Sequence, residues 1–257
     1  MPELEAKNLN VHFPLSDRGI FSGGSAPKNM ITVDSRRYIL ALSDISFNIL
    51  QGTKLGVIGR NGSGKSTLLR VLGSIYAPTG GTLKVTGKVS SLFNINLGAQ
   101  PDVSGRQNIL LRGLVKGWSS KEVRARMPEI IEFSELGEFI DLTIRTYSDG
   151  MRMRLLFAIA TAFSPEILLL DEWIGAGDSN FQKKAAERMN ALVDGAGITV
   201  IASHNRALLK RVCDTGIWLD QGVMRAFGPI EDVYKEMDAH LAASKRSEDH
   251  RPQPSEE

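Results

Sequence analysis

The stretch GRNGSGKST, residues 59–67, stands between the apolar run KLGVIG and a segment with helical spacing, KSTLLRVLGSI. It contains glycine, four residues and then Gly64-Lys65-Ser66, the pattern of a phosphate-binding loop when a buried strand precedes it and a helix follows. Glycines let backbone N–H groups turn inward around a triphosphate, at the positive end of the following helix. A glycine-rich turn with an incidental lysine is the alternative, and the flanking strand and helix disfavour it. The stretch therefore predicts an α/β fold that binds a nucleoside triphosphate.

Two side chains of this loop have specific expected roles. Lys65 should neutralise the β- and γ-phosphates, and Ser66 should offer its hydroxyl to Mg²⁺. The residues expected to surround the phosphates are Gly59, Asn61, Gly62, Ser63, Gly64, Lys65, Ser66 and Thr67.

Acidic residues end the apolar run EILLLDE, residues 166–172, and a histidine ends the run GITVIASH, residues 197–204. Such runs are typical of strands buried on both faces of a parallel sheet. Asp171 is placed to hold Mg²⁺ through water, and Glu172 to accept a proton from the attacking water. His204, on the expected neighbouring strand, could hydrogen-bond the γ-phosphate and hold that water. Each group alone fits an ordinary polar strand end, but beside a phosphate loop they predict a hydrolytic site.

The bulk composition sets modest limits. The 257 residues could form one large domain or two small ones, and the net charge of +2 indicates no preference for nucleic acid. The single cysteine, Cys213, excludes an internal disulfide and fits a buried core thiol. The N-terminus lacks the features of a secretion signal, and no apolar run approaches the ~18 residues that cross a bilayer. We expect a soluble, cytosolic chain that would need another chain to span a membrane.

The remaining pattern gives the expected organisation. Residues 3–13 and 38–50 read as strands separated by a loop rich in Gly, Ser and Pro, and residues 80–93 as further short strands. Residues 105–163 read as mostly helical, with breaks at Pro128 and near Gly137. The segment GIWLDQGVMRAFG reads as a hairpin that turns at Asp220-Gln221-Gly222. We predict one nucleotide-binding domain over 1–240, with a helical subdomain around 100–160, and a polar, disordered tail over 241–257.

The stretch YSDGM, residues 147–151, reads alone as a helix start, with Ser148 as N-cap. In order along the chain, however, the motifs resemble those of the nucleotide-binding subunit of ABC transporters. GRNGSGKST is similar to the Walker A loop, ILLLDE to the Walker B strand and YSDGM to the signature usually written LSGGQ. GAGD, residues 175–178, resembles the D-loop, and ASH, residues 202–204, the histidine switch. The resemblance covers roughly residues 3–235.

This resemblance implies a P-loop NTPase cassette with a RecA-like core, an N-terminal antiparallel β region and a helical subdomain. It implies ATP and Mg²⁺ as cofactors, and a head-to-tail dimer in which the signature of one copy closes over the ATP of the other. Ser148 and the N–H of Gly150 would then face the γ-phosphate of the neighbouring subunit. Gly150 would let the backbone approach. Tyr38 is similar in placement to the aromatic residue that stacks on adenine, although an ordinary strand tyrosine is a serious competing interpretation.

The chain departs from the family pattern at two motifs. The signature has Tyr147 for leucine, Asp149 for glycine and Met151 for glutamine, and we expect the Asp149 carboxylate to point away from the phosphate. At the Q-loop, where the family usually has glutamine, the chain has Ile95 between Asn94 and Asn96. Asn94, Asn96 or neither could take that role.

Within the family, the chain is most similar to cassettes that export polysaccharides such as O-antigen, capsule or teichoic acid. The features that carry this similarity are GRNGSGKSTLLR, the irregular Q-loop followed by SGRQNI, and GDSNFQKKAAERM. The expected partners are a second copy, a separate transmembrane permease that selects a lipid-linked glycan, and no nucleic acid. The expected location is the cytoplasmic face of the inner membrane, as a peripheral subunit.

Three other functions are open from the sequence. A P-loop kinase would share the phosphate loop but would have no use for YSDGM or a histidine switch. A non-transport ABC ATPase of DNA repair or translation usually carries long insertions or two cassettes. An importer cassette for a small solute is the nearest alternative, separated mainly by the irregular Q-loop.

Overall fold

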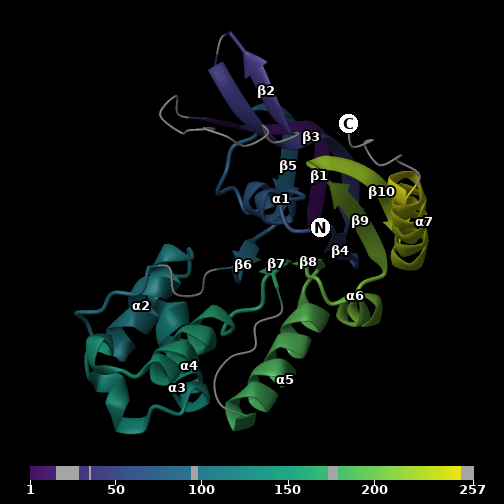
Figure 1. Cartoon of the computed structure of the whole chain (residues 1–257). Coiled ribbons are helices and arrows are strands. Elements are labelled where there is room, and N and C mark those ends of the chain that lie inside the picture. Colours follow the sequence, from purple (N-terminus) through teal and green to yellow (C-terminus); the bar gives the residue numbers. More distant parts are fainter. Residues whose placement is uncertain (16–28, 35, 94–97, 173–178, 250–257) are drawn as a thin grey trace, which may run out of the picture. The chain divides into compact units, whose positions relative to one another are not determined.

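The computed structural model describes residues 1–15, 29–34, 36–93, 98–172 and 179–249 (Figure 1). The chain forms two compact units. The first comprises Met1–Lys88, Leu169–Glu172 and Gly197–Glu257, and the second comprises Val89–Leu168 and Trp173–Ala196.

The first unit is built around a sheet with strand order β5-β1-β3-β10-β9-β4-β8-β7. Of β7, the part from Leu169 onward belongs to this unit. A further strand, β2, pairs with β3. The strands are β1 (Glu3–Pro14), β2 (Met30–Val33), β3 (Arg36–Leu50), β4 (Lys54–Ile58), β5 (Gly80–Thr86), β7 (Ile167–Asp171), β8 (Ile198–Ala202), β9 (Thr215–Asp220) and β10 (Val223–Pro229).

The sheet has an antiparallel part and a parallel part. β1 pairs antiparallel with β3 and β5, and along β1 buried residues such as Leu4 and Ala6 alternate with more exposed ones. β4 instead lies between β8 and β9, parallel to both. β4 from Leu55 onward and the whole of β8 are buried without alternation, which is the pattern of a strand covered on both faces. The predicted antiparallel N-terminal region and parallel core are both present.

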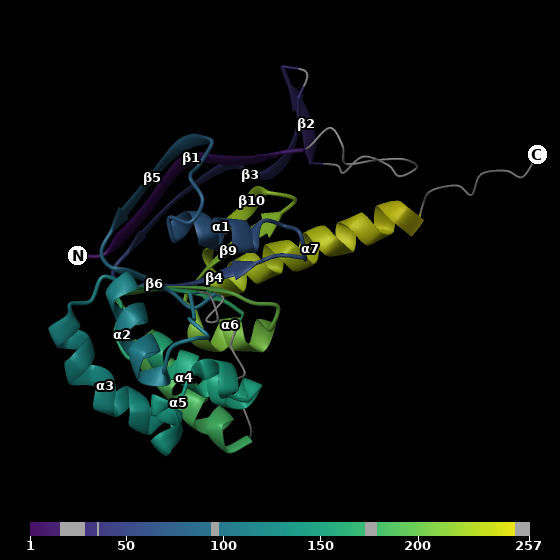
Figure 2. The same ribbon diagram turned by 90° about the vertical axis from the view of Figure 1, so that its left-hand side faces the viewer.

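Three helices belong to the first unit: α1 (Lys65–Leu72), α6 (Arg206–Val212) and α7 (Ile230–Asp249). α7 lies along β9 and β10 (Figures 1 and 2). Ile230 approaches Gly56 and Gly216, so these glycines leave room for the helix on the sheet. A disordered tail was predicted to start at residue 241, which is too early, because α7 continues to Asp249. Cys213 is buried as expected, and burial raises the pKa of its thiol to about 12.

The second unit is mainly helical. It contains β6 (Val89–Ser91), α2 (Gly105–Val115), α3 (Ser120–Ser134), the 3₁₀ turns η1 (Gly137–Asp141) and η2 (Ile144–Thr146), α4 (Asp149–Ala160) and α5 (Ser179–Gly195). Phe133, Phe157 and Phe181 pack against one another and join α3, α4 and α5. Pro128 was expected to break the helix, but it lies inside α3. Capping at Ser119 and burial of Val123, Ile130 and Phe133 hold α3 continuous across the proline.

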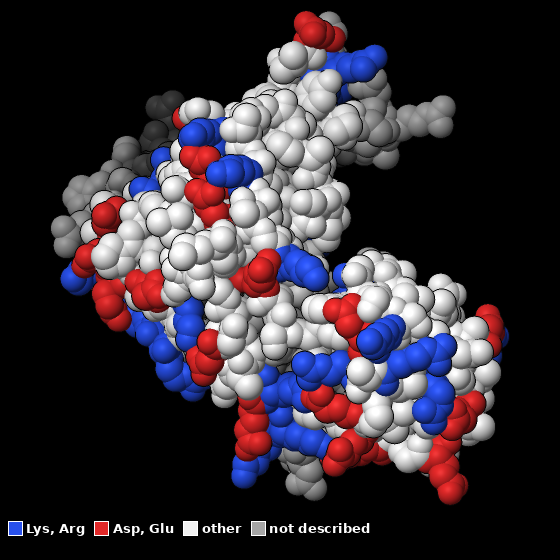
Figure 3. Space-filling view, turned by 180° about the vertical axis from the view of Figure 1, so that it is seen from behind, with Lys and Arg blue, Asp and Glu red and all other residues white. Residues whose placement is uncertain are grey.

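The surface charges of the two units are mixed in sign. Figure 3 shows Lys and Arg side chains interspersed with Asp and Glu side chains on the face that it presents. No helix in the described part of the chain is long and apolar enough to cross a membrane.

Candidate nucleotide site

The phosphate loop joins β4 to α1, as its sequence predicts. Gly59, Gly62 and Gly64 have φ values of +155°, +78° and +105°, which L side chains rarely adopt. A Cβ on Gly59 would lie 2.3 Å from the carbonyl oxygen of Leu219, and one on Gly64 would lie 2.7 Å from that of Ala41. At Gly62 no atom of the described residues beyond its chain neighbours lies within 4 Å of the Cβ position. Two of the glycines are therefore required by close backbone neighbours, and the third by its conformation alone.

Lys65 is buried at the start of α1, and its ammonium group is turned onto the loop. Its Nζ donates hydrogen bonds to the carbonyl oxygens of Gly59 at 2.8 Å and Arg60 at 3.1 Å. Burial lowers the pKa of Lys65, and the charges of Glu172 and Asp171 act in the opposite direction. A buried cation beside the loop offers a strong electrostatic partner for phosphate oxygens.

The N-terminus of α1 has no side-chain cap, because its N-cap residue is Gly64. The backbone N–H groups of its first turn, which begins with Lys65, are available to an anion at the positive end of the helix. The hydroxyl of Ser63 is buried and has no hydrogen-bond partner within the described residues. These features fit a phosphate group.

A turn distant in sequence braces the phosphate loop. The β9–β10 hairpin turns through Gln221 and Gly222, which both have positive φ as a type I′ turn requires, and this confirms the predicted hairpin. The N–H of Gly222 donates to the carbonyl of Ser63 at 3.0 Å. The carbonyl of Gly222 in turn accepts from the N–H of Ser43 at 2.8 Å. The hairpin turn therefore ties the loop to strand β3.

The predicted catalytic groups meet at the ends of β7 and β8. Asp171 ends β7 and Glu172 follows, with its N–H bonded to the carbonyl of Ala202 at 2.8 Å. One carboxylate oxygen of Glu172 accepts from the hydroxyl of Ser203 at 3.3 Å, and the other lies 3.3 Å from Nε2 of His204. The prediction that the strands carrying Asp171 and His204 are neighbours is confirmed.

A cavity of about 560 Å³ brings the loop and these groups together. From the predicted set it is lined by Asn61, Gly62, Gly64, Lys65, Ser66, Thr67, Asp171, Glu172 and His204. Ser66 and Asp171 supply one hydroxyl and one carboxylate, which matches the few protein ligands that Mg²⁺ takes when phosphates and water complete its shell.

The other wall of this cavity differs from the prediction. Among the described residues it is formed by Phe13, Asn29, Ile39 and Ala41, and Tyr38 is not part of it. Side chains alternate along a strand, so Ile39 and Ala41 face the cavity while Tyr38 faces the other way, against His12. Within the described part of the chain, Phe13 is thus the aromatic side chain on this wall of the cavity. Sequence reasoning missed it because Phe13 reaches the cavity through the pairing of β1 with β3, where it lies opposite Ile39.

The signature residues lie in the second unit, at the N-terminus of α4. Ser148 is the N-cap, as predicted, and its Oγ accepts the N–H of Met151 at 3.2 Å. The serine hydroxyl still has a proton to donate. Gly150 is exposed, and outside the backbone of its own helix a Cβ added to it would meet, among the described residues, Ser148 Oγ at 3.9 Å. The Asp149 side chain is fully exposed and lies 3.7 Å from Arg152. Residues 175–178, Asn94 and Asn96 fall outside the described residues.

A second cavity, of about 480 Å³, lies wholly in the second unit. It is lined by Gly98, Gln100, Val103, Leu111, Arg112, Val115 and Lys116. We refer to it as the α2 cavity. Two of its lining residues, Leu111 and Val115, are exposed, and so is Leu114 on the same helix.

A glycine-rich loop after the buried parallel strand β4, a buried lysine, and acidic groups at the end of β7, with β8 between the two strands, define a P-loop nucleoside-triphosphate-binding protein. The family model described as ABC transporter matches residues 42–175. The chain belongs to the ABC transporter family, as the sequence motifs predicted, and it is an ATPase of that family.

Two relatives and one solved structure illustrate the similarity. The O-antigen export system ATP-binding protein RfbB of Klebsiella pneumoniae is 37% identical over 242 residues, which cover 91% of this chain and 98% of the relative. The protein of the same name from Myxococcus xanthus is 47% identical over 198 residues, 77% of this chain, and this chain spans only 45% of that relative. The dimeric structure of MJ0796, a bacterial ABC transporter cassette, has a TM-score of 0.64 at 24% identity and covers 88% of this chain and 98% of its own. The predicted α/β cassette fold is confirmed.

Proposed function

We propose that the chain is the ATP-hydrolysing subunit of an exporter that moves a lipid-linked polysaccharide across the cytoplasmic membrane. The observation that carries the ATPase part is the 560 Å³ cavity, which brings the phosphate loop, Asp171, Glu172 and His204 together. The cargo is proposed from similarity to relatives named for O-antigen export. A glycan of the O-antigen, capsule or teichoic acid type fits this proposal.

In the proposed mechanism, Lys65 leaves its carbonyl partners on the loop and binds the β- and γ-phosphates. Backbone N–H groups at the start of α1 bind the remaining phosphate oxygens. Mg²⁺, held by Ser66 and through water by Asp171, would neutralise phosphate charge. Glu172 accepts the proton of the attacking water. His204, whose Nε2 lies beside the Glu172 carboxylate, hydrogen-bonds the γ-phosphate.

The proposed working unit is a head-to-tail homodimer. The first unit supplies the phosphate loop and the acids, while Ser148 and Gly150 lie at the exposed N-terminus of α4 in the second unit. Ser148 uses one lone pair for the cap and keeps its O–H for a phosphate of the other copy. Two-fold symmetry then gives two equivalent composite sites.

A separate transmembrane permease is the other proposed partner. The α2 cavity is mainly apolar, its lining residues Leu111 and Val115 are exposed, and Leu114 on the same helix is exposed as well. Together with the segment from residue 93 to 101 it is the surface that we propose receives a cytoplasmic helix of the permease. The chain would then work at the cytoplasmic face of the membrane as a peripheral subunit, and the mixed surface charge gives no support for nucleic acid as a partner (Figure 3).

The cargo can be tested in the source organism. The gene would be replaced by the Glu172→Gln variant, with the wild-type gene and Glu166→Gln as controls, because Glu166 is an exposed acid before the same strand. If the chain drives glycan export, the Glu172→Gln strain alone should lose surface glycan and accumulate lipid-linked glycan inside the cell. Normal surface glycan together with loss of uptake of a small solute would identify an importer instead.

A further inference from the structure

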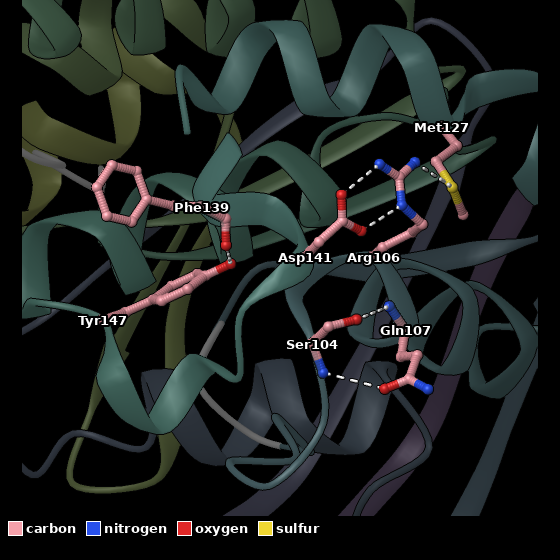
Figure 4. A network of polar contacts seen from close by, with 7 residues as sticks. All are labelled: Ser104, Arg106, Gln107, Met127, Phe139, Asp141 and Tyr147. Carbon is pink, nitrogen blue, oxygen red and sulfur yellow. Dashed lines mark hydrogen bonds and ion pairs between the residues drawn. The ribbon is translucent and has the colours of Figure 1, made fainter. Parts of the chain in front are cut away.

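Tyr147, directly before the N-cap of α4, is a buried tyrosine whose hydroxyl contacts two other elements. Only 5% of the residue is exposed, and its O–H donates to the carbonyl of Phe139 in η1 at 2.6 Å (Figure 4). Gly105, the first residue of α2, packs against the same hydroxyl, and its N–H donates to the carbonyl of Leu142 at 3.2 Å. A Cβ at Gly105 would lie 2.5 Å from this oxygen, so glycine is what allows the approach. Burial raises the pKa of the Tyr147 hydroxyl, which therefore stays a hydrogen-bond donor.

The tyrosine belongs to a larger set of contacts between two chain segments, Pro101–Arg106 and Phe139–Tyr147, which we call the strap. The N–H of Arg145 donates to the carbonyl of Pro101 at 2.9 Å, and that of Ile144 to the carbonyl of Val103 at 3.2 Å. The guanidinium of Arg106 donates to both carboxylate oxygens of Asp141, at 2.7 and 3.1 Å (Figure 4). The two segments are thus joined along their length by backbone and side-chain bonds.

One end of the strap forms a wall of the α2 cavity. Val103 of the strap and Gln100, which directly precedes the strap, line that cavity. Asn108, which is completely buried, accepts from the N–H of Gln100 at 2.9 Å and donates to its carbonyl at 3.0 Å. This wall is therefore fixed to α2. The other end of the strap is Tyr147, whose neighbour Ser148 caps α4.

We propose that Tyr147 is a positioning residue for the signature: its hydroxyl fixes the N-terminus of α4 to η1 and α2, so that the α2 cavity wall and Ser148 move together. The proposal rests on the proposed function, because it assumes that Ser148 acts on the ATP of the other copy. The hydroxyl is suited to this role because a leucine at the same position could fill the space but could not hold η1 through a hydrogen bond.

A purely structural role predicts a different outcome from a positioning role. If the hydroxyl only stabilised the fold, its loss would lower thermal stability and affect ATP binding and turnover alike. If it positions Ser148, its loss affects turnover, which needs the closed dimer, and leaves ATP binding at the phosphate loop unchanged.

The test compares Tyr147→Phe with Thr146→Val in the purified full chain. The control removes a hydroxyl that donates to the Thr143 carbonyl at 2.7 Å, a bond that stays within η2 and its N-cap. We expect Tyr147→Phe to lower kcat about 3- to 10-fold, the effect of one lost hydrogen bond, with unchanged equilibrium binding of ATP in EDTA. Thr146→Val should keep wild-type kcat. Wild-type kcat in Tyr147→Phe, or kcat, ATP affinity and Tm falling together, would overturn the proposal.

A second pair of variants covers the case in which Tyr147→Phe does not fold. Arg106 and Asp141 are both exposed, so their charges can be exchanged at little cost to folding. Arg106→Asp should lower kcat, and adding Asp141→Arg should restore it, whereas equal kcat in the single and double variants would count against the strap. If the wild-type chain hydrolyses no ATP, or if Lys65→Ala hydrolyses ATP as well as wild type, the proposed function itself is rejected.

Discussion

Glu172 holds a backbone conformation that is rare for a residue with a side chain, with φ at +69°. Such a conformation persists where the surroundings fix it, and it is common at functional sites. Here the N–H is bonded to Ala202, and the carboxylate lies between Ser203 and His204. The backbone therefore aims this carboxylate into the cavity, while Asp171 ends the strand.

Replacing Glu172 by Gln should abolish turnover and keep ATP binding. Glutamine has the same shape but cannot accept the proton of water, and loss of a general base costs about 10²-fold or more. Steady-state phosphate release and binding of labelled ATP measure the two effects. Turnover within a few-fold of wild type would contradict the assigned role.

Gly59→Ala should prevent ATP binding, because its Cβ would lie 2.3 Å from the Leu219 carbonyl and 2.4 Å from Ser63 Oγ. The loop must shift to admit the methyl group. Gly52→Ala is the matched control, since Gly52 also has positive φ, at +95°, but no atom of the described residues beyond its chain neighbours lies within 4 Å of the added Cβ. ATP binding and Tm would be measured for both. We expect the control to lose stability by about 1 kcal/mol from backbone strain alone and to bind ATP normally. Equal ATP affinity in the two variants would show that the loop tolerates the methyl group.

At the scale of elements, the sequence was most informative where the signal was local. The strands that carry the phosphate loop and Asp171 were predicted because continuous apolar runs and glycines are readable in a single segment. Ser148 was predicted as an N-cap for the same reason.

The wrong expectations involved tertiary contacts. Which face of β3 is turned to the nucleotide cavity depends on its pairing with β1 and β2. The sequence therefore did not show that Ile39, and not Tyr38, lines the cavity. The continuity of α3 through Pro128 depends on its capping box and on burial against neighbours. The end of α7 was placed early because its last turns are polar and lack an apolar pattern.

Helix α2 should crosslink to the permease if the α2 cavity is its docking surface. Val115 is 88% exposed at the end of this helix and offers a site that can be changed without altering the core. Val115→Cys would be compared with Glu236→Cys, an exposed position on α7, in a Cys213→Ala background that removes the native thiol. With a crosslinker that joins the introduced thiol to a nearby lysine amine, we expect a covalent product with the permease from the first variant. Efficient crosslinking from the α7 position alone would place the docking surface elsewhere.

At the scale of the whole molecule, the two units carry different halves of the proposed machinery. Lys65 belongs to the first unit and Ser148 to the second. In a head-to-tail dimer each composite site would combine the Lys65 of one copy with the Ser148 of the other. A single chain would then be incomplete as an enzyme, even though its phosphate loop is fully formed.

Mixed dimers test this arrangement. Lys65→Ala and Ser148→Arg should each be inactive as homodimers, because both sites are damaged. In the mixed dimer both lesions fall in one site and the other remains intact, so ATP occlusion and part of the hydrolysis should return. Occlusion is measured beside turnover, since strict cooperativity between sites would suppress turnover alone. Neither activity returning in purified mixed dimers would contradict the trans arrangement.

The bond between Gly222 and Ser63 also has a consequence for biosynthesis. The ribosome makes the glycine-rich loop early, but the turn that braces it is encoded about 160 residues later. A nascent chain that ends before the β9–β10 hairpin also lacks β9, the strand that pairs along one side of β4. Contacts of such long sequence separation form late and slowly. We therefore expect nucleotide to stabilise the growing polypeptide through this loop only after the hairpin has left the exit tunnel, and truncated products to remain substrates for chaperones and proteases.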